Sequence, residues 1–322
     1  MTAALQIPAM TAGSRVLAFG DYRPARVVTN DDLAAKVDTS DEWIRSRVGI
    51  VQRHIAADDE GIVELGVHAG AKALAGSGLA PSDIDLVILA TCSAESPMPG
   101  HAAQVAHRLG IDAPGAFDLN AACAGFCYAL ATASAAVRTG SARNALVIGS
   151  EKMSQWIDWT DRSTCIIFAD GAGAAVVAAS ESAGIGPVVW GSAGDKYDKI
   201  IIEDRNSFIR QEGQAVFRWA TTAIAPVAVE ACERAGVKPE DLAAIVPHQA
   251  NLRIIEAIAR KVKAANAVVA DDIVHTGNTS GASIPLAMSR MIERGDVPSG
   301  APALLVGFGA GLSYAAQVIQ IP

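Results

Sequence analysis

The segment 117–127, FDLNAACAGFC, holds the residue best suited to nucleophilic chemistry, Cys123. The segment is predicted to leave a strand, make a tight turn of small residues and enter a helix near Cys123. A thiol at a helix N-terminus faces unpaired backbone N–H groups and the positive end of the helix dipole, and both favour the thiolate. The alternative is a buried, inert cysteine, which is what most free cysteines are. This segment alone leaves both interpretations open.

Three further segments place polar or glycine residues where chemistry is possible. His248 follows a buried strand and precedes a helix, a place where a histidine is more often structural than catalytic. Asn278 lies in a turn of small polar residues, HTGNTSGASIP, which also suits asparagine for backbone reasons alone. The glycine-rich segment 307–315, GFGAGLSYA, lacks the Lys-Ser/Thr pair of a phosphate loop, so its glycines are better explained by backbone N–H groups that approach a reacting oxygen.

Two basic clusters stand out in the chain. Residues 40–56 hold one aromatic and three basic side chains, Trp43, Arg45, Arg47 and Arg53. A guanidinium pairs with phosphate and an indole stacks on a purine, although a surface salt-bridge network explains the same residues equally well. The second cluster lies on a helical stretch in 248–263, which carries four cations and Glu256, a local net charge of +3 (4 − 1). The four cations are Arg253, Arg260, Lys261 and Lys263. A solvated helix face is the usual explanation of such a cluster.

Composition narrows the class of protein. The 322 residues are 51% hydrophobic, enough for a large core, and carry a formal net charge of −8, which argues against general nucleic-acid binding. No apolar run of about 18 residues exists to span a bilayer, and the N-terminus lacks the features of a secretion signal. The five cysteines have no CxxC spacing, which favours reduced thiols and no metal site. We therefore expect a cytoplasmic protein that binds neither nucleic acid nor membrane.

Buried strands alternate with helices along the chain. Continuous apolar runs, typical of strands buried on both faces, occur at 85–91, 145–151 and 173–179. A first strand is predicted at 15–21, and the main helices are predicted at 61–77, 101–109 and 216–236. The alternation indicates a layered α/β architecture.

A single offset relates two halves of the chain. The segments 120–149 and 278–307 each contain a turn, a helix and a buried strand, and they are separated by 158 residues (278 − 120). Upstream, Pro81 and Pro239 lie in similar segments at the same offset (239 − 81 = 158). A shared offset without gaps indicates duplication, with one half at 1–180 and the other at 181–322.

The duplication has a consequence for the candidate residues. The loop of Cys123 is matched by the loop of Asn278, and His248 lies at the strand end that matches the one after residues 85–91. Equivalent loops on two facing halves can converge on one cleft, so these residues can meet although they are far apart in sequence.

Several of these segments together resemble one known family. DLNAACAGF, PHQANLRI, HTGNTSGASIP and GFGAGLSYA, in this order and spacing, resemble β-ketoacyl-acyl-carrier-protein synthase III. The resemblance extends from about Arg15 to Pro322, and it includes SDEWIRSRVGI and TDRSTCIIFADGAGAAVV. It implies a thiolase-like, five-layered αβαβα fold of two duplicated halves, in agreement with the repeat, and a homodimer.

The resemblance also implies a reaction and a catalytic triad, Cys123, His248 and Asn278. The thiolate would attack an acyl-CoA thioester, and the backbone N–H groups of Cys123 and Gly309 would hold the oxyanion. His248 and Asn278 would hydrogen-bond the thioester oxygen of malonyl-acyl-carrier-protein, so that decarboxylation yields an enolate. A Claisen condensation with the acyl-cysteine would give a β-ketoacyl-acyl-carrier-protein, the start of fatty-acid or related polyketide synthesis, without a metal or other cofactor.

Binding positions carry over from the same resemblance. The adenine of CoA would lie between Trp43 and Arg162, with Arg47 on the phosphate side, and the pantetheine tunnel would be lined by Gln214, Phe217 and Asn251. The primer pocket would include Phe308 and Met98, the latter reaching across the dimer interface. The basic helix face with Arg253, Arg260, Lys261 and Lys263 would dock the acidic acyl carrier protein. This chain departs from the usual family residues at Gln214, at Gly281 near the active-site loop, and at Met98, and the flexible side chain of Met98 leaves primer length and branching open.

Other activities remain as alternatives at this stage. A same-fold acyltransferase that moves an acyl group to an alcohol or amine would not require Asn278. A thiolase would need a second active-site cysteine, and the other four lie outside the expected turn: Cys92, Cys127, Cys165 and Cys232. A non-catalytic partner that only sets chain length in a heterodimer would not need the complete triad. The residues therefore favour the condensing enzyme.

Overall fold

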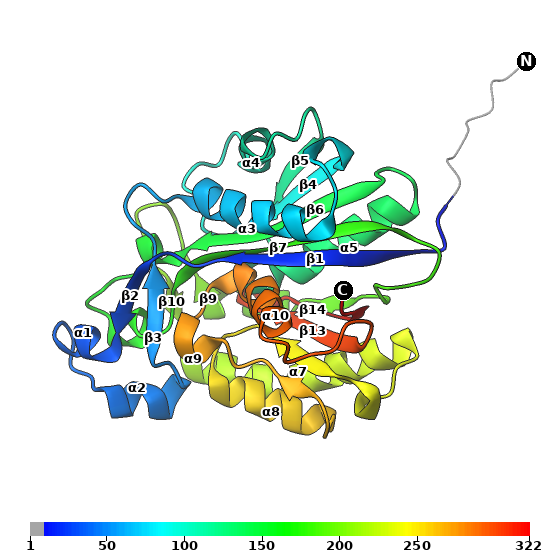
Figure 1. Cartoon of the computed structure of the whole chain (residues 1–322). Coiled ribbons are helices and arrows are strands. Elements are labelled where there is room, and N and C mark those ends of the chain that lie inside the picture. The colour runs from blue at the N-terminus through cyan, green and yellow to red at the C-terminus, as the bar shows by residue number, and fades with distance from the viewer. Residues whose placement is uncertain (1–9) are drawn as a thin grey trace, which may run out of the picture.

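The computed structural model describes residues 10–322 (Figure 1), so part of the N-terminus on which the absence of a secretion signal was judged lies outside the described residues. Two five-stranded sheets form the centre of the molecule. The first sheet has the order β1 (Gly13–Tyr22), β7 (Asp170–Ser180), β6 (Asn144–Lys152), β4 (Leu86–Ala90) and β5 (Gly115–Leu119). The second has the order β8 (Val189–Gly191), β14 (Tyr314–Gln320), β13 (Pro302–Phe308), β11 (Ala244–Pro247) and β12 (Val268–Val269).

The two sheets repeat one topology. In the first, β4 pairs in parallel with β5 and β6, and β7 runs antiparallel between β6 and β1. In the second, β11 pairs in parallel with β12 and β13, and β14 runs antiparallel between β13 and β8. The first residues of β6 and β13 differ by the predicted offset (302 − 144 = 158). The duplication seen in the sequence is therefore present in the fold.

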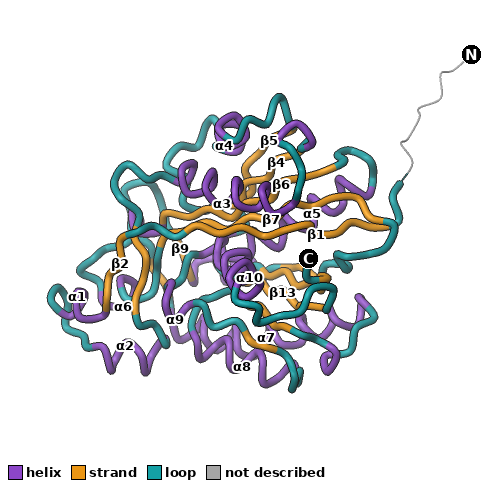
Figure 2. The backbone as a smooth tube through the Cα atoms, viewed as in Figure 1, coloured by secondary structure: helices purple, strands orange, loops and turns teal. Residues whose placement is uncertain are grey.

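Helices form three layers around the sheets (Figure 2). The helices α3 (Ile62–Ser77) and α4 (Ala102–Arg108) cover the outer face of the first sheet. Between the sheets lie α5 (Gly125–Arg138) and α10 (Ser283–Glu293), and the outer face of the second sheet is covered by α7 (Gly213–Ala235) and α8 (Leu252–Val262). This arrangement is the five-layered αβαβα fold that was expected.

Small residues let the central helices approach the sheets closely. A Cβ atom added to Gly173 of β7 would lie 2.4 Å from the backbone N of Leu286, and one added to Gly149 of β6 would lie 2.5 Å from the carbonyl oxygen of Gly281. The central helices bury side chains on several faces because a sheet lies on either side of them; in α5 these include Phe126, Leu130 and Ala133. This close packing fixes the start of α10, which borders the site described below.

One segment of the first half crosses to the second. Residues 26–55 form β2 (Arg26–Thr29), α1 (Asn30–Ala34), α2 (Asp41–Val48) and β3 (Gln52–Ile55). They pack against α8 and α9 (Ile273–Thr276), with Ile44 and Ile50 buried beside Ile255 and Ile273. The last strand of the first half ends at Ser180, and the first strand of the second half begins at Val189. Because residues 26–55 pack against the second half, the two halves nevertheless form one packed unit. None of the helices in residues 10–322 has both the length and the apolar character needed to cross a bilayer.

Candidate active site

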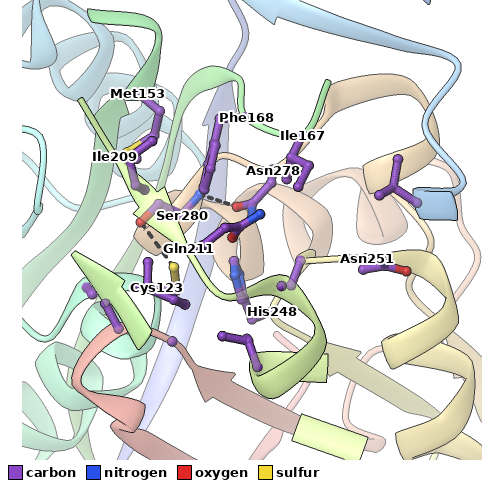
Figure 3. A pocket seen from close by; sticks show the side chains of 18 of the residues that line it. Cys123, Met153, Ile167, Phe168, Ile209, Gln211, His248, Asn251, Asn278 and Ser280 are labelled. Carbon is purple, nitrogen blue, oxygen red and sulfur yellow. Dashed lines mark hydrogen bonds between the residues drawn. The ribbon is translucent and has the colours of Figure 1, made fainter. Parts of the chain in front are cut away.

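A cavity of about 730 Å³ brings together Cys123, His248 and Asn278, which come from three different loops (Figure 3). Its walls are mostly apolar and include Ile166, Phe168 and other residues contributed by both halves. The short helix α6 (Arg162–Cys165) and the small hairpin of β9 (Ile200–Ile201) and β10 (Arg210–Gln211) border it as well. A mostly apolar cavity with a few convergent polar groups is the usual form of a small-molecule site.

Cys123 lies on a strained turn between β5 and α5. The residue before it, Ala122, has φ 47°, a left-handed conformation that is costly for alanine. The side-chain oxygen of Asn120 accepts a hydrogen bond from the Ala122 N–H at 3.0 Å and holds the turn. The α-helix begins at Gly125, two residues after Cys123 (125 − 123 = 2). The thiol thus lies at a helix entrance, as the sequence predicts.

The protonation state of Cys123 differs from the expectation. Burial raises the pKa of the Cys123 thiol to about 11, although the Ser280 hydroxyl and the backbone N–H groups of Cys123 and Ala310 lower it. The hydration free energy that a thiolate loses on burial is larger than the stabilisation that these hydrogen-bond donors provide. In the free site the thiol is therefore protonated at neutral pH. The backbone donors at the helix entrance do favour the thiolate, as expected, but burial outweighs them.

The N–H of Gly309, which was predicted to be an oxyanion donor, is already hydrogen-bonded within its own loop. The N–H of Gly309 donates to the carbonyl oxygen of Ser313 at 3.0 Å, whereas the N–H groups of Ala310 and Cys123 face the sulfur. Gly309 is needed for a different reason, because an added Cβ would lie 2.6 Å from the Cβ and 2.9 Å from the Sγ of Cys123. The glycine makes room for the Cys123 side chain, and the N–H of the next residue, Ala310, faces the sulfur.

Asn278 presents an N–H donor to the cavity. Its Oδ1 accepts a hydrogen bond from the Ser280 N–H at 2.8 Å, so its Nδ2 is left to point into the cavity (Figure 3). The backbone of Asn278 is tied on both sides to the segment 167–169, by its N–H to the Ile167 carbonyl at 3.0 Å and by its carbonyl to the Ala169 N–H at 2.9 Å. The amide is therefore rigidly placed as a donor.

His248 presents a second donor. It follows β11 directly, is 2% exposed, and its Nδ1 lies 2.8 Å from the hydroxyl of Ser283. That hydroxyl already accepts from the Gln249 N–H at 3.3 Å, so its own hydrogen is free to be donated to Nδ1. When the hydroxyl donates to Nδ1, the proton of the neutral ring lies on Nε2. Burial lowers the pKa of His248 to about 3, so the ring stays neutral at physiological pH.

The residues expected to hold adenine lie in contact with each other. The guanidinium of Arg162 lies 4.9 Å from the centre of the Trp43 ring, and that of Arg47 lies 5.6 Å from it. Arg162 is held there by a hydrogen bond to the Asp38 carbonyl at 2.6 Å. A purine between Trp43 and Arg162 therefore requires the arginine to move, because a 4.9 Å spacing leaves no room for a ring.

The residues expected to line the pantetheine tunnel all line the cavity. Gln214 and Phe217 lie in the first two turns of α7, and Arg253 stacks on the Phe217 ring at 5.1 Å beside the mouth. Asn251 also lines the cavity, and its side chain caps α8 while donating to the Arg47 carbonyl at 3.1 Å. Asn251 thus joins the two edges of the entrance.

The two basic clusters differ in burial and in pairing. Arg53 is fully buried and donates to the Asn30 side chain and to the Ile166 carbonyl, so it is no phosphate ligand, contrary to the interpretation of the 40–56 cluster. Arg45 pairs with Asp41 on the surface. On and just after α8 the four cations are exposed, and Lys261 also donates to the Thr221 carbonyl of α7. This leaves Arg253 and Arg260, seven residues apart, on one face of the helix (260 − 253 = 7).

The two residues assigned to the primer pocket lie in different surroundings. Phe308 is buried, lines the cavity and packs edge-on against the His248 ring, with centroids 5.3 Å apart. Met98 is 82% exposed on the loop after β4 and does not line the cavity of its own chain. The deep cavity wall near Cys123 consists instead of residues such as Cys92 and Met153.

Several polar residues of the site were missed from the sequence. Ser280 lies 3.4 Å from the Cys123 sulfur and Ser283 holds His248, although both belong to the HTGNTSGASIP segment. Cys92 lines the same cavity as Cys123, whereas the sequence placed it outside the active-site turn. Glu151 is fully buried behind them. One signal was available for Glu151, because it is the repeat partner of Gly309 (309 − 151 = 158).

Family models match both halves of the chain. Residues 117–194 match the model for 3-oxoacyl-[acyl-carrier-protein] synthase III, and residues 232–321 match the model for its C-terminal part. The chain is similar to β-ketoacyl-[acyl-carrier-protein] synthase III 4 of Streptomyces coelicolor, with 58% identity over 97% of this chain and 100% of that protein. It is 60% identical to β-ketoacyl-[acyl-carrier-protein] synthase III 2 of Streptomyces avermitilis, over 96% of this chain and 99% of that one.

Solved structures show the same similarity. The priming β-ketosynthase from the R1128 polyketide biosynthetic pathway superposes with a TM-score of 0.96 at 44% identity, covering 99% of both chains. The 3-oxoacyl-[acyl-carrier-protein] synthase III from Aquifex aeolicus superposes with a TM-score of 0.91 at 40% identity, covering 96% of this chain and all of that one.

Proposed function

The chain belongs to the 3-oxoacyl-[acyl-carrier-protein] synthase III family, and from this premise we propose how its residues carry out the family's reaction. The enzyme condenses an acyl-CoA primer with malonyl-acyl-carrier-protein and gives a β-ketoacyl-acyl-carrier-protein. This is an acyl transfer in which loss of carbon dioxide supplies the carbanion, so the reaction needs no separate cofactor. One observation carries the assignment of roles: the Cys123 thiol and the side chains of His248 and Asn278 face the same cavity.

Cys123 is the proposed nucleophile of the first half-reaction. Its sulfur attacks the primer carbonyl, CoA leaves as a thiolate that takes a proton from water, and an acyl-cysteine remains. The N–H groups of Cys123 and Ala310 face the sulfur, where the oxyanion of the tetrahedral intermediate forms. Each such donor is worth on the order of a hundredfold in rate.

His248 and Asn278 are the proposed electrophilic pair of the second half-reaction. Their Nε2–H and Nδ2–H groups donate to the thioester oxygen of the malonyl group, which becomes an enolate oxygen when carbon dioxide leaves. The enolate carbon attacks the acyl-cysteine, and Cys123 is released. A neutral His248 suits this role because it must donate a hydrogen bond without giving up its proton.

Binding of CoA is proposed to open the Trp43–Arg162 stack. Arg162 would leave Trp43 and close on the other face of the adenine, while Arg47 lies beside the same ring for the phosphates. The pantetheine arm then passes Gln214, Phe217 and Asn251 to reach Cys123. Arg253 and Arg260, together with Lys261 and Lys263, form the proposed docking face for the acidic acyl carrier protein.

We also propose a cytoplasmic homodimer. Strand β5 is an edge strand of the first sheet, with Phe117 of that strand 41% exposed and Met98 nearby on the loop after β4. An exposed aromatic on an unpaired edge is unusual unless it is covered by a partner. A second copy against β5 would cover Phe117 and bring Met98 toward the partner's primer pocket.

The assignment of roles is tested by separating the two half-reactions. Intact-protein mass is measured after incubation with a panel of acyl-CoAs, and release of carbon dioxide is then measured with malonyl-acyl-carrier-protein. Wild type should gain one acyl group and Cys123→Ala none. Asn278→Ala should acylate like wild type but decarboxylate about 100-fold more slowly, since one of two donors is lost.

The matched control is Asn266→Ala, at an exposed asparagine, which should behave as wild type. An Asn278→Ala enzyme that decarboxylates normally would remove Asn278 from the mechanism. An acyl-enzyme that malonyl-acyl-carrier-protein cannot discharge, but an alcohol or amine can, would instead support the simple acyltransferase.

A further inference from the structure

A fully buried carboxylate, that of Glu151, lies behind Cys123. Glu151 lies near the end of β6, is 0% exposed, and is surrounded by neutral donors. It accepts hydrogen bonds from the N–H groups of Cys92 and Ser93 at 3.1 Å each and from the Gly281 N–H at 3.2 Å. The hydroxyls of Thr91 and Ser93 also donate to it. Burying a carboxylate without a cationic partner is costly, so its place beside the active site calls for an explanation.

The duplication explains how the carboxylate comes to lie there. Cys123 and Gly281 are repeat partners, as are Gly309 and Glu151 (281 − 123 = 158 and 309 − 151 = 158). In one half Gly309 touches Cys123, and in the other Glu151 touches Gly281. The position that leaves room for the nucleophile in one half therefore holds an internal carboxylate in the other.

A continuous chain of hydrogen bonds joins this carboxylate to the nucleophile. The Cys123 sulfur lies 3.4 Å from the Ser280 hydroxyl, and this hydroxyl lies 3.2 Å from the Cys92 sulfur. The Cys92 thiol in turn donates to Oε1 of Glu151 at 3.3 Å. Each intermediate group has one hydrogen to give and a lone pair to receive one, so all the hydrogens can point toward Glu151.

We propose that Ser280 and Cys92 relay the proton of the Cys123 thiol to Glu151 when Cys123 is acylated. The inference rests on the proposed role of Cys123 as nucleophile. Cys123 gives its proton to Ser280, Ser280 gives one to Cys92, and Cys92 gives one to Glu151. The net change is a thiol and a carboxylate becoming a thiolate and a carboxylic acid, with no change in total charge. When condensation releases Cys123 as a thiolate, the proton returns by the same route.

The relay explains how the protonated thiol of the free site can act as a nucleophile. Burial raises the pKa of the Cys123 thiol to about 11, so the nucleophile needs a base, and His248 is required as a donor in the other half-reaction. Burial also raises the pKa of Glu151, which makes it a better proton acceptor than an exposed carboxylate. The titratable groups around Cys123 are Cys92 after β4, Glu151 on β6, His248 after β11 and Cys127 on its own helix α5. Of these, Cys92 and Glu151 belong to the hydrogen-bonded chain.

The test removes one member of the chain and then restores its chemistry. Rates of acyl-enzyme formation are measured by rapid-quench mass spectrometry for wild type, Cys92→Ala and Cys92→Ser between pH 6 and 9. Cys92→Ala should slow acylation by roughly 10-fold to 100-fold at pH 7, and its rate should rise about tenfold per pH unit because hydroxide must replace the relay. Cys92→Ser keeps a hydroxyl that can pass a proton, so it should stay within about threefold of wild type and keep its pH profile. Glu151→Gln should behave like Cys92→Ala.

Two controls separate the relay from folding and from the proposed function. Cys232→Ala removes a buried cysteine of α7 that does not line the cavity, and it should acylate as wild type does. Decarboxylation of malonyl-acyl-carrier-protein without primer should remain normal in every Cys92 variant, since it does not use the thiol proton. Normal acylation in Cys92→Ala, or equal damage in Cys92→Ser, overturns the relay alone. A wild-type protein that forms no acyl-enzyme overturns the proposed function and the relay with it.

Discussion

Burial shifts the two titratable members of the triad in opposite directions. The pKa of His248 falls to about 3 and that of Cys123 rises to about 11, in each case because burial disfavours the charged form. Both groups are therefore neutral at physiological pH. A site with a neutral thiol and a neutral ring needs no counter-ions. The two acyl substrates can therefore enter the cavity one after the other without displacing an ion.

The His248 shift makes a prediction for stability against pH. Between about pH 6.5 and 3 the unfolded histidine binds a proton while the folded one does not, so stability falls as the pH is lowered through 6.5. The loss is at most about 1.4 kcal/mol per pH unit, or about 2 kcal/mol between pH 6.5 and 5. Urea unfolding at pH 7, 6 and 5 should show this extra loss in wild type and not in His248→Gln.

The control for this comparison is His275→Gln, at an exposed histidine, which should keep the wild-type dependence. If wild type and His248→Gln lose stability in parallel from pH 7 to 5, His248 is not held neutral by burial.

Gly309 makes a second prediction at the scale of one residue. In Gly309→Ala the new methyl group would lie 2.6 Å from the Cys123 Cβ, so one of the two loops must shift. Acylation should fall by about 100-fold or more, because small displacements of a reacting group are costly. Gly61→Ala is the matched control, since its Cβ would meet nothing within 4 Å. Equal acylation rates in the two variants would show that the close contact does not matter.

At the scale of elements, the two catalytic loops are copies of one turn. Ala122 and Ser280 both have φ 47°, and each N–H donates to the side chain of the asparagine two residues earlier, Asn120 or Asn278. The duplicated turn was used differently in the two halves. One copy places a thiol at the helix entrance, and the other leaves its asparagine amide free to act as a donor.

The segment 26–55 supplies a prediction that separates structure from binding. Arg53 is buried and joins this segment to residue 166 behind the cavity, whereas Arg47 is exposed at the entrance. Arg53→Met should lower the free energy of unfolding by about 3 kcal/mol, because buried acceptors lose their donor. Arg47→Met should leave stability within about 0.5 kcal/mol of wild type and raise the KM for acyl-CoA.

Denaturant unfolding and steady-state kinetics on the two variants test this pair. A destabilised Arg47→Met with unchanged KM, or an Arg53→Met of wild-type stability with weak CoA binding, would reverse the two assignments.

At the scale of the whole molecule, the two sheets end in equivalent edge strands of unequal length. Strand β5 is five residues long and carries exposed Phe117, and its repeat counterpart β12 is two residues long and carries exposed Val268. Longer, more apolar edges pair more readily with another chain. The proposed dimer therefore uses β5 and leaves β12 free.

This choice of edge is tested by sedimentation. Phe117→Asp should convert a dimer into monomers at micromolar concentration, and Val268→Asp should leave the dimer intact. Dissociation by Val268→Asp alone would place the interface on the other sheet, and a wild-type monomer would remove the dimer.

Much of the architecture was accessible from the chain alone. Continuous apolar runs predicted β4, β6 and β7 to within a few residues, because strands buried on both faces need apolar residues throughout. The offset of 158 predicted the duplication, and it holds at the first residues of β6 and β13. The residues around Cys123, His248 and Asn278 resembled one family strongly enough to indicate the reaction.

The chain by itself determined the elements, their duplication and the candidate reacting side chains, since these follow from local pattern and residue type. Only the tertiary structure decided how those side chains behave. Burial, which no local pattern reports, set the pKa values of Cys123 and His248. The folded chain paired the Gly309 N–H with the Ser313 carbonyl, buried Arg53 against the Ile166 carbonyl, and placed Cys92 and Glu151 beside Cys123. Contacts across more than a hundred residues depend on how two halves pack, and sequence spacing along one strand or helix does not contain that information.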